Sequence, residues 1–405
     1  MNLFAMKLGM VGRIFKCKPL SLTGIKRAVA LRIAQIALAI AGASAGAPVA
    51  AEAPVNHWNS VQIAELRHWV SDAPRDALPL LDTKALNAAQ LSSDSAAADR
   101  AATDLALRLA RMHLLGCAGP AQRAGWRIKD SDESIDLSAR LTEALASGEV
   151  DSFFESLRPR HPDYVALRAA YADEADPQRR TSLARNMERW RWMPQSLGNS
   201  YILVNAATFE ARLWRDGKQA GTWPVIVGKR STPTPVFAAT VKGVILNPWW
   251  VVPASIVREM RGRFPASKGY VRSGGRIMQR PGPGNALGQM KLDMPNAFTV
   301  YMHDTPGKHL FGREVRTFSH GCIRTGNALD FAATLLDGVM TREEVDAIVA
   351  TGKTTNVALA SGLPIYITYF TAGIRGDGEL AIMDDVYNRD SRVGAAEDAH
   401  RTCGG

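Results

Sequence analysis

HDTPGKHLFGREVRTFSHGCIR, residues 303–324, is the stretch around which the rest of this 405-residue chain is organised. It places one cysteine, Cys322, directly behind Ser319-His320-Gly321, and another histidine, His303, 19 residues upstream. A thiol with an ordinary pKa of about 8.5 is mostly protonated at neutral pH, so a nucleophilic cysteine needs a nearby imidazole or positive charge. The stretch therefore predicts a nucleophile and a candidate base. By spacing alone, a lone cysteine beside histidines is more often a buried small hydrophobe or an incidental thiol.

The residues on either side of this stretch show two different periodicities. Upstream, residues 298–303 alternate between apolar and other side chains, which predicts a half-buried strand with Tyr301 and His303 on one face. Downstream, the apolar positions follow a helical rhythm that ends at Gly338, at Leu329, Ala332, Ala333 and Leu336. Cys322 is therefore expected in a loop that leads into a helix.

The same contrast divides the whole chain and predicts an α+β protein. Residues 54–195 read as helices, with 92–102 as either a helix or a mobile connector, and Trp190 and Trp192 are expected in a core near a domain boundary. From Tyr201 the period is two, with a hairpin turn at Asp216-Gly217 and strands expected at 222–227, 242–247, 298–303 and 365–370. Thr341 and Glu344 predict a capping box for a short helix.

The first 51 residues differ from the rest in charge. They hold seven basic residues and no acids, followed by an apolar run from Ile33 to Ala47 and small-residue cleavage sites such as Ala45-Gly46-Ala47. This order is typical of an export signal, and the run is short for a membrane span of about 20 residues, so a cleaved signal is favoured over an uncleaved anchor. Its removal lowers the net charge from +10 to +3. The basic composition therefore reflects targeting, and no nucleic-acid motif is present.

The chain has four cysteines, and Cys17 falls within the predicted signal. An exported chain would keep Cys117, Cys322 and Cys403, and an odd number in an oxidising compartment leaves at least one free thiol. Cys117 and Cys403 could pair, but the sequence alone does not show that they are close together.

The segments SHGCIR (319–324) and YMHDTP (301–306) resemble the active-site signature of the YkuD-type L,D-transpeptidases of cell-wall metabolism. RPGPGNALGQMKLDMPN (280–296) extends the resemblance to the large periplasmic, YcbB-like branch of that family, and the likeness covers roughly Asn186 to Asp390. It implies an export signal at 1–51, a helical scaffold domain at 52–195, a mainly-β catalytic domain with short helices at 196–388 and a loose tail at 389–405.

The resemblance also implies the chemistry. Cys322 would take an acyl group from the third residue of a peptidoglycan stem peptide, release the terminal D-alanine, and pass the acyl group as a thioester to an acceptor amine. His303 would be the general base and acid. No cofactor and no metal are expected, and the protein would work in the periplasm of a Gram-negative type envelope. The oligomeric state and the acceptor are not implied, and contact with a membrane would come only through an uncleaved signal.

Other residues of the motifs have weaker roles, each with an alternative. The Gly321 and Cys322 amides and the Tyr301 hydroxyl would form an oxyanion hole, although Tyr301 could equally be a core residue. Arg324, and less strongly Arg280, would bind substrate carboxylates, although Arg324 could instead brace the loop through backbone carbonyls. Ser319 and His320 would shape the loop or orient His303. Asp304 is not expected to orient His303, because neighbours on a strand face opposite ways.

Two departures from the family leave alternatives open. The small wall-binding module of larger relatives is missing between Tyr171 and Leu183, and the capping insertion over the active site is reduced to residues 255–279. A more open site would admit water, so the same residues could trim stems or release wall-attached protein hydrolytically. A non-catalytic wall-binding scaffold is a third interpretation. A zinc site is disfavoured, because the spacing of the histidines and Cys322 matches no zinc motif.

Overall fold

The computed structural model describes residues 56–394 and residue 403. The predicted export signal at 1–51, and most of the predicted loose tail after residue 394, lie outside the described residues. Within residues 56–394, no helix is both long and apolar enough to cross a membrane.

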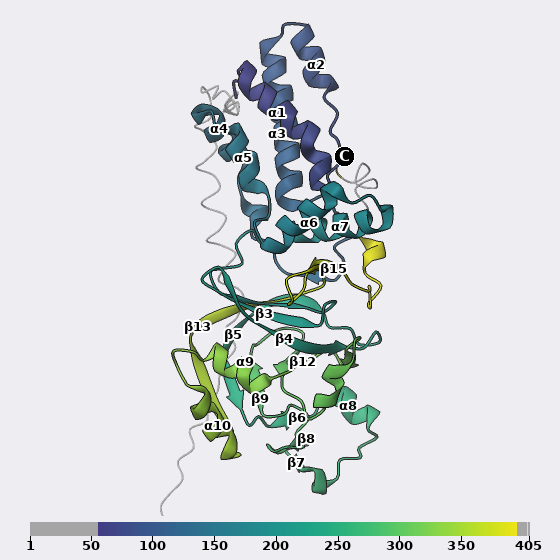
Figure 1. Ribbon diagram of the computed structural model, residues 1–405, viewed down its shortest axis with the longest axis vertical. Coiled ribbons are helices and arrows are strands. Elements are labelled where there is room, and N and C mark those ends of the chain that lie inside the picture. Colours follow the sequence, from purple (N-terminus) through teal and green to yellow (C-terminus); the bar gives the residue numbers. More distant parts are fainter. Residues whose placement is uncertain (1–55, 395–402, 404–405) are drawn as a thin grey trace, which may run out of the picture. The chain divides into compact units, whose positions relative to one another are not determined.

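Seven α-helices occupy the first part of the described chain, as the sequence predicts (Figure 1). They are α1 (Ser60–Asp72), α2 (Lys84–Leu91), α3 (Ser95–Leu115), α4 (Leu137–Ser147), α5 (Val150–Leu157), α6 (Pro162–Asp173) and α7 (Pro177–Trp190), with short 3-10 turns η1 (Ala73–Asp76) and η2 (Asp132–Ser134). Side-chain caps explain several starts: Asn59 forms a capping box with Gln62, and the Asp94 carboxylate accepts from the Ala97 amide. The segment 92–102, left open by the sequence, is helical from Ser95.

These helices contribute to two hydrophobic cores. Side chains of α1 to α5 pack with one another, whereas α6 and α7 share a core with the β-sheet that follows. Trp190 and Trp192 are both buried, as predicted, and Trp190 stacks on Phe370 of the sheet region with ring centroids 4.5 Å apart. The helical layer nearest the sheet is thus packed against it, beside the β14–β15 hairpin in Figure 1.

The rest of the chain is mainly β, which confirms the α+β prediction. Its strands are β1 (Trp126–Arg127), β2 (Tyr201–Asn205), β3 (Glu210–Arg215), β4 (Lys218–Gly228), β5 (Val236–Leu246), β6 (Trp250–Val251), β7 (Tyr270–Ser273), β8 (Arg276–Gln279), β9 (Met290–Asp293), β10 (Met302–His303), β11 (Thr317–Ser319), β12 (Ile323–Thr325), β13 (Thr355–Thr368), β14 (Ala372–Ile374) and β15 (Leu380–Ile382). Between them lie α8 (Ala254–Glu259), α9 (Ala328–Leu335) and α10 (Arg342–Ala350), with 3-10 turns η3 (Ala266–Lys268), η4 (Lys308–Gly312) and η5 (Asp390–Arg392).

The main sheet runs in the order β1-β5-β13-β2-β3-β4-β12-β10-β9. Because β9 also pairs with β5, the path from β5 to β9 closes on itself. The predicted turn at Asp216-Gly217 joins β3 to β4, and both of its residues have positive φ, as a tight hairpin requires. The predicted Thr341–Glu344 capping box is present at the start of α10.

One predicted strand is largely wrong. Only Met302 and His303 of the stretch 298–303 form a strand, and Thr299 has a φ of 54°. The cause is local, because the side-chain oxygen of Asn296 accepts hydrogen bonds from the amides of Phe298 and Val300 and folds the backbone into a turn.

A buried ion pair connects α6 to the sheet. The guanidinium of Arg212 on β3 donates two hydrogen bonds to the Asp163 carboxylate at the start of α6, at 3.0 and 2.6 Å. Both side chains are buried, and the two-pronged geometry is the strongest form of this interaction.

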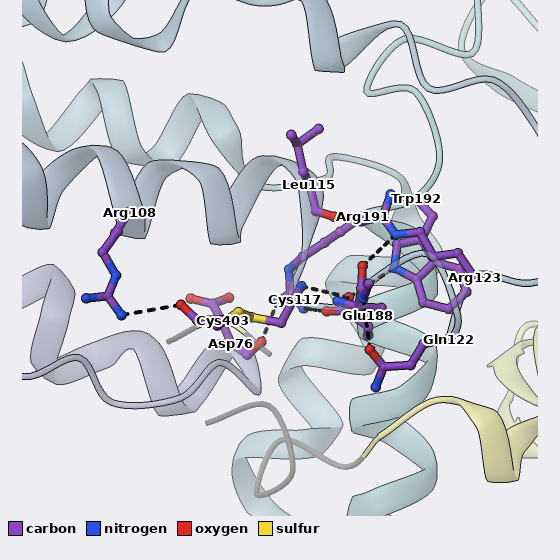
Figure 2. Close-up of a disulfide and its surroundings, with 12 residues drawn as sticks. Asp76, Arg108, Leu115, Cys117, Gln122, Arg123, Glu188, Arg191, Trp192 and Cys403 are labelled. Carbon is purple, nitrogen blue, oxygen red and sulfur yellow. Dashed lines mark hydrogen bonds and ion pairs between the residues drawn. A yellow bond between two sulfur atoms is a disulfide. The ribbon is translucent and has the colours of Figure 1, made fainter. Parts of the chain in front are cut away.

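A disulfide joins Cys117, just after α3, to Cys403, and their Cα atoms are 5.1 Å apart (Figure 2). The Glu188 carboxylate holds the Cys117 end in place by accepting the Cys117 and Ala118 amides, each at 2.8 Å, and Trp192 Nε1 at 3.0 Å. Among the described residues Cys322 is the free cysteine, which agrees with the expectation of one unpaired thiol.

Candidate active site

Two short parallel strands bring His303 and Cys322 together. In the ladder between β10 and β12, Met302 pairs with Ile323 and His303 pairs with Arg324, and the Ile323 amide donates to the Tyr301 carbonyl at 2.8 Å. Cys322 immediately precedes β12, as Tyr301 immediately precedes β10. The 18 residues between His303 and Cys322, 304–321, thus form a crossover between neighbouring strands.

The alternation along these strands places the motif residues on a common face. Met302 and Ile323 are fully buried in the core. The residues on either side of them point the other way. By this alternation Tyr301, His303, Cys322 and Arg324 belong to the second face, although Tyr301 precedes the strand β10 and its sharing of a face with His303 stays a prediction.

The sequence missed a fifth residue of this group. Lys291 on β9 is the antiparallel partner of His303, so Lys291, His303 and Arg324 form a row across three adjacent strands. The Lys291 ammonium lies 3.9 Å from the centre of the Tyr301 ring, in a cation–π contact. Within the described part of the chain, neither Lys291 nor Arg324 forms a salt bridge with a carboxylate. The site therefore carries uncompensated positive charge next to the thiol.

His303 is buried and is held in one orientation. Its Nδ1 donates to the backbone carbonyl of Asp304, so the neutral tautomer leaves Nε2 as the acceptor. Burial lowers the pKa of His303 to about 4, and the charges of Arg324 and Lys291 act in the same direction against the Asp304 interactions. At neutral pH the imidazole is therefore uncharged and able to accept a proton.

The Asp304 side chain makes its hydrogen bonds elsewhere, but its backbone carbonyl bonds to His303 Nδ1 and orients the ring, which the prediction did not include. The Asp304 carboxylate accepts from the Gln289 amide at 2.9 Å and from the Lys308 ammonium. It also fills the space that a Cβ at Gly288 would occupy, so the glycine of the 280–296 motif is needed for this close approach.

Cys322 is half-buried, and burial raises the pKa of its thiol. A backbone hydrogen bond at Tyr301 and the charges of Arg324 and Lys291 act in the opposite direction. With a neutral imidazole and a protonated thiol at rest, the site suits a mechanism in which the proton leaves sulfur as the nucleophile attacks.

Ser319 and Gly321 set the shape of the loop before Cys322. Ser319 Oγ accepts from the Gly321 amide at 3.1 Å and donates to the Cys322 carbonyl, while Gly321 has a φ of 109°, a conformation that favours glycine. Thr234 Oγ1 donates to the Gly321 carbonyl at 2.9 Å. Because the Gly321 amide is engaged by Ser319, the Cys322 amide is the better placed of the two predicted oxyanion donors.

His320 makes its contact with Glu259, and among the described residues no hydrogen bond joins it to His303. Its Nε2 lies 2.7 Å from the Glu259 carboxylate at the end of α8, and Glu259 is also 3.9 Å from the Lys229 ammonium. His320 therefore joins the loop of Cys322 to the segment predicted as a reduced lid, which consists of α8, η3, β7 and β8.

The structure does not bring Arg280 into the row of Lys291, His303 and Arg324. Its side chain is exposed, and its backbone amide donates to the Gly269 carbonyl at 3.0 Å, beyond the end of β8. Arg324, in contrast, is half-buried beside Cys322. Across residues 56–394 and Cys403, no cluster of three or more histidine, cysteine or acidic side chains could hold a metal ion.

A neutral imidazole, a thiol and two cations on one face of a closed sheet can support acyl transfer through a cysteine. Two family models match the chain: the L,D-transpeptidase catalytic domain (YkuD) at residues 199–354, and the Scaffold domain at residues 56–170. The chain thus contains a YkuD-type L,D-transpeptidase catalytic domain, preceded by a Scaffold domain.

A curated relative agrees with this assignment. The chain is 29% identical over 244 residues to a Haemophilus influenzae protein named "Putative L,D-transpeptidase", with 53% of this chain and 49% of that protein covered. The match thus spans about half the length of the relative.

Solved structures that match part of the chain include an L,D-transpeptidase from Mycobacterium smegmatis, at 16% identity and a TM-score of 0.24, with 42% of this chain and 58% of that chain covered. Another is L,D-transpeptidase 3 from Mycobacterium tuberculosis in complex with a faropenem-derived adduct, at 15% identity and a TM-score of 0.25, with 42% and 60% covered. The family assignment rests on the two domain matches.

Proposed function

We propose that the protein is an exported peptidoglycan L,D-transpeptidase that works in the periplasm and links third-position residues of stem peptides. The observation that carries the proposal is the pairing of His303 with Arg324 beside the free thiol of Cys322, within a matched YkuD domain. The Cys117–Cys403 disulfide supports export, because such bonds persist in oxidising compartments.

The first half-reaction forms a thioester. His303 Nε2 takes the proton of the Cys322 thiol as sulfur attacks the carbonyl carbon of the third stem residue, and the carbonyl oxygen becomes an oxyanion. The Cys322 amide and the Tyr301 hydroxyl are positioned near this oxygen. When the tetrahedral intermediate collapses, the C–N bond to D-alanine breaks, and His303 returns its proton to the leaving amine.

The second half-reaction transfers the acyl group. The side-chain amine of an acceptor stem attacks the thioester carbonyl, His303 takes a proton from the amine, and the sulfur leaves and is reprotonated as the thiol. Stem peptides carry several carboxylates, and the two cations of the site, Lys291 and Arg324, supply complementary charge for such a substrate. No cofactor is required at any step.

Water is the alternative acceptor. The segment 255–279 that would cover the site is short, and a half-exposed pair between His320 and Glu259 joins it to the loop of Cys322. If water enters the acyl-enzyme, the same residues perform L,D-carboxypeptidase chemistry or release wall-attached protein.

Intact-protein mass spectrometry with a tetrapeptide muropeptide tests the proposal. We expect a transient mass gain on the peptide that contains Cys322, loss of D-alanine, and a dimer linked through third-position residues. The same adduct ending only in shortened monomer would assign hydrolysis. Full turnover by Cys322→Ala would refute the cysteine mechanism. Sacculus binding that is unchanged in Cys322→Ala, with no adduct in the parent protein, would assign a wall-binding scaffold.

A further inference from the structure

A cavity of about 100 Å³, separate from the Cys322 site, is lined by four arginines and, among the residues that the structure describes, by no carboxylate. The arginines are Arg123, which follows α3, Arg189 on α7, and Arg389 and Arg392 at η5. Clustered guanidinium groups repel one another, so a folded protein keeps them together only when other groups compensate the charge. The four arginines differ in the groups that compensate their charge.

Two of the four are already compensated. Arg189 donates to the Asp390 carboxylate at 2.6 Å. Arg123 donates to the carbonyls of Leu115 and Ala118 at the end of α3, and its guanidinium lies over the Trp192 ring, 5.4 Å from the centre (Figure 2). Because of these contacts, Arg189 and Arg123 do not need a ligand to satisfy their hydrogen bonds or their charge.

Arg389 is not fully compensated. Its Nη2 donates to the Thr234 carbonyl at 3.0 Å, and its guanidinium lies 4.8 Å from the centres of the Tyr369 and Tyr387 rings. Its Nη1 is buried and has no hydrogen-bond partner among the described residues. A buried, charged donor without a partner destabilises the folded state, because it has lost its hydrogen bonds to water and has formed none within the protein.

Arg392 adds a second cation to the same cavity. Its side chain is exposed, and it forms no ion pair within the described part of the chain. Burial, together with the charges of Arg189 and Arg392, lowers the pKa of Arg389 against the effect of the two tyrosines. The cavity thus contains an unpaired buried donor, a second unpaired cation, and an aromatic wall formed by Trp192 and Tyr369.

We propose that this cavity is a binding site for one small oxyanion, a carboxylate or a phosphate group, held by Nη1 of Arg389 and the guanidinium of Arg392. The planar fork of an arginine matches both kinds of oxyanion, and the volume suits a ligand of a few heavy atoms. The site lies close to the loop of Cys322, because Arg389 contacts Thr234, whose hydroxyl donates to the Gly321 carbonyl. The groups that would bind the anion take no part in the proposed transpeptidation.

Calorimetric titration of the full chain with inorganic phosphate, and separately with acetate, at constant ionic strength tests the site. We expect one anion to bind per chain, and Arg392→Gln to weaken binding about 10-fold, the effect of one charge-assisted hydrogen bond. Arg392 is exposed, so this variant should fold. Arg276→Gln, which removes the same charge at an exposed position on β8, should bind as the parent does. Tighter binding of phosphate would identify a phosphate group as the ligand, and tighter binding of acetate would identify a carboxylate.

Location is checked with selenate, whose selenium gives an anomalous signal in crystals. A selenium peak beside Arg389 and Arg392 would support the site. The inference is overturned if neither anion binds at millimolar concentrations, if Arg392→Gln and Arg276→Gln bind equally well, or if the cavity holds only water in crystals grown with selenate.

Discussion

His303 and Arg324 are paired residues in the parallel ladder of β10 and β12, so a buried neutral imidazole lies beside a guanidinium that does not lose its charge. Burial is the main cause of the low pKa of His303, about 4, and Arg324 adds to it. A thiol whose pKa is raised by burial lies on the same face. The imidazole of His303 and the thiol of Cys322 are therefore both neutral at rest, and their charges develop only when a substrate carbonyl is present.

The pH dependence of acylation should reflect this neutral pair. Activity requires unprotonated His303, so we expect the rate of Cys322 acylation by a carbapenem to rise with pH around 4 and stay level through neutral pH. Stopped-flow or mass-spectrometric rates between about pH 3.5 and 9 would measure this pH dependence. A midpoint near the ordinary histidine value of about 6.5 would show a solvated imidazole. No adduct at any pH would contradict a reactive thiol.

Lys291 should contribute to binding of the donor stem. Lys291→Met keeps a long apolar side chain but removes the charge, and with it the cation–π contact with Tyr301, so we expect KM for a tetrapeptide to rise about 10-fold with a smaller change in kcat. Lys242→Met, at an exposed position on β5, is the matched control. With a substrate whose carboxylates are amidated, Lys291→Met and the parent should give the same KM. An effect of equal size on both substrates would indicate a structural role.

Ser319 should act through the loop. Ser319→Ala removes the acceptor of the Gly321 amide and the donor to the Cys322 carbonyl, so we expect acylation of Cys322 to slow by about 10-fold or more, with a stability loss of about 1–2 kcal/mol. Ser319→Thr retains the hydroxyl and should recover part of the rate. If Ser319→Ala acylates at the parent rate, the loop geometry does not depend on this hydroxyl.

Stability should fall in mild acid. His113, His161 and His303 are buried, and burial lowers their pKa values to about 3, 4 and 4. In the unfolded chain these histidines have ordinary pKa values, so between about pH 6.5 and 4 the unfolded state binds more protons and the free energy of unfolding decreases as the pH falls. Urea unfolding at several pH values would measure a loss of roughly 1–3 kcal/mol per histidine. Stability that is constant from pH 7 to 4 would contradict the burial of these rings.

The disulfide should stabilise the fold without taking part in the chemistry. Cys403→Ser opens a link between residues 286 positions apart, so we expect a lower Tm and a loss of about 2–5 kcal/mol. The rate of Cys322 acylation at a temperature well below the transition should match that of the parent. A large change in that rate would show that the link reaches the active site.

Local signals allowed part of the fold to be predicted. The turn at Asp216-Gly217 and the capping box of Thr341 and Glu344 depend on neighbouring residues, and both are present in the structure. The strand expected at 298–303 is mostly absent, because the Asn296 side chain bonds to nearby amides and turns the backbone, an effect that apolar alternation does not reveal.

In the active site, too, the residues of a local motif could be predicted, whereas a residue placed by strand pairing could not. Cys322, His303, Tyr301 and Arg324 were found through a contiguous motif, and the structure brings them to one face. Lys291 was missed because its position depends on which strand pairs with β10, a matter of topology rather than of local sequence. Alternation within 290–293 indicates a strand, but it does not identify the neighbour of that strand. The roles assigned to these residues remain predictions until the variants are measured.

The two-pronged ion pair between Asp163 and Arg212 bears on how this protein can be divided. A fragment that begins after α7 would retain Arg212 in a buried position on β3 without its carboxylate, and breaking such a pair from one side costs about 3–5 kcal/mol. The same cut would remove α6 and α7 from the core that they share with the sheet. For purification, crystallisation or inhibitor screening, the smallest dependable unit is therefore one that retains the helices from α6 onward.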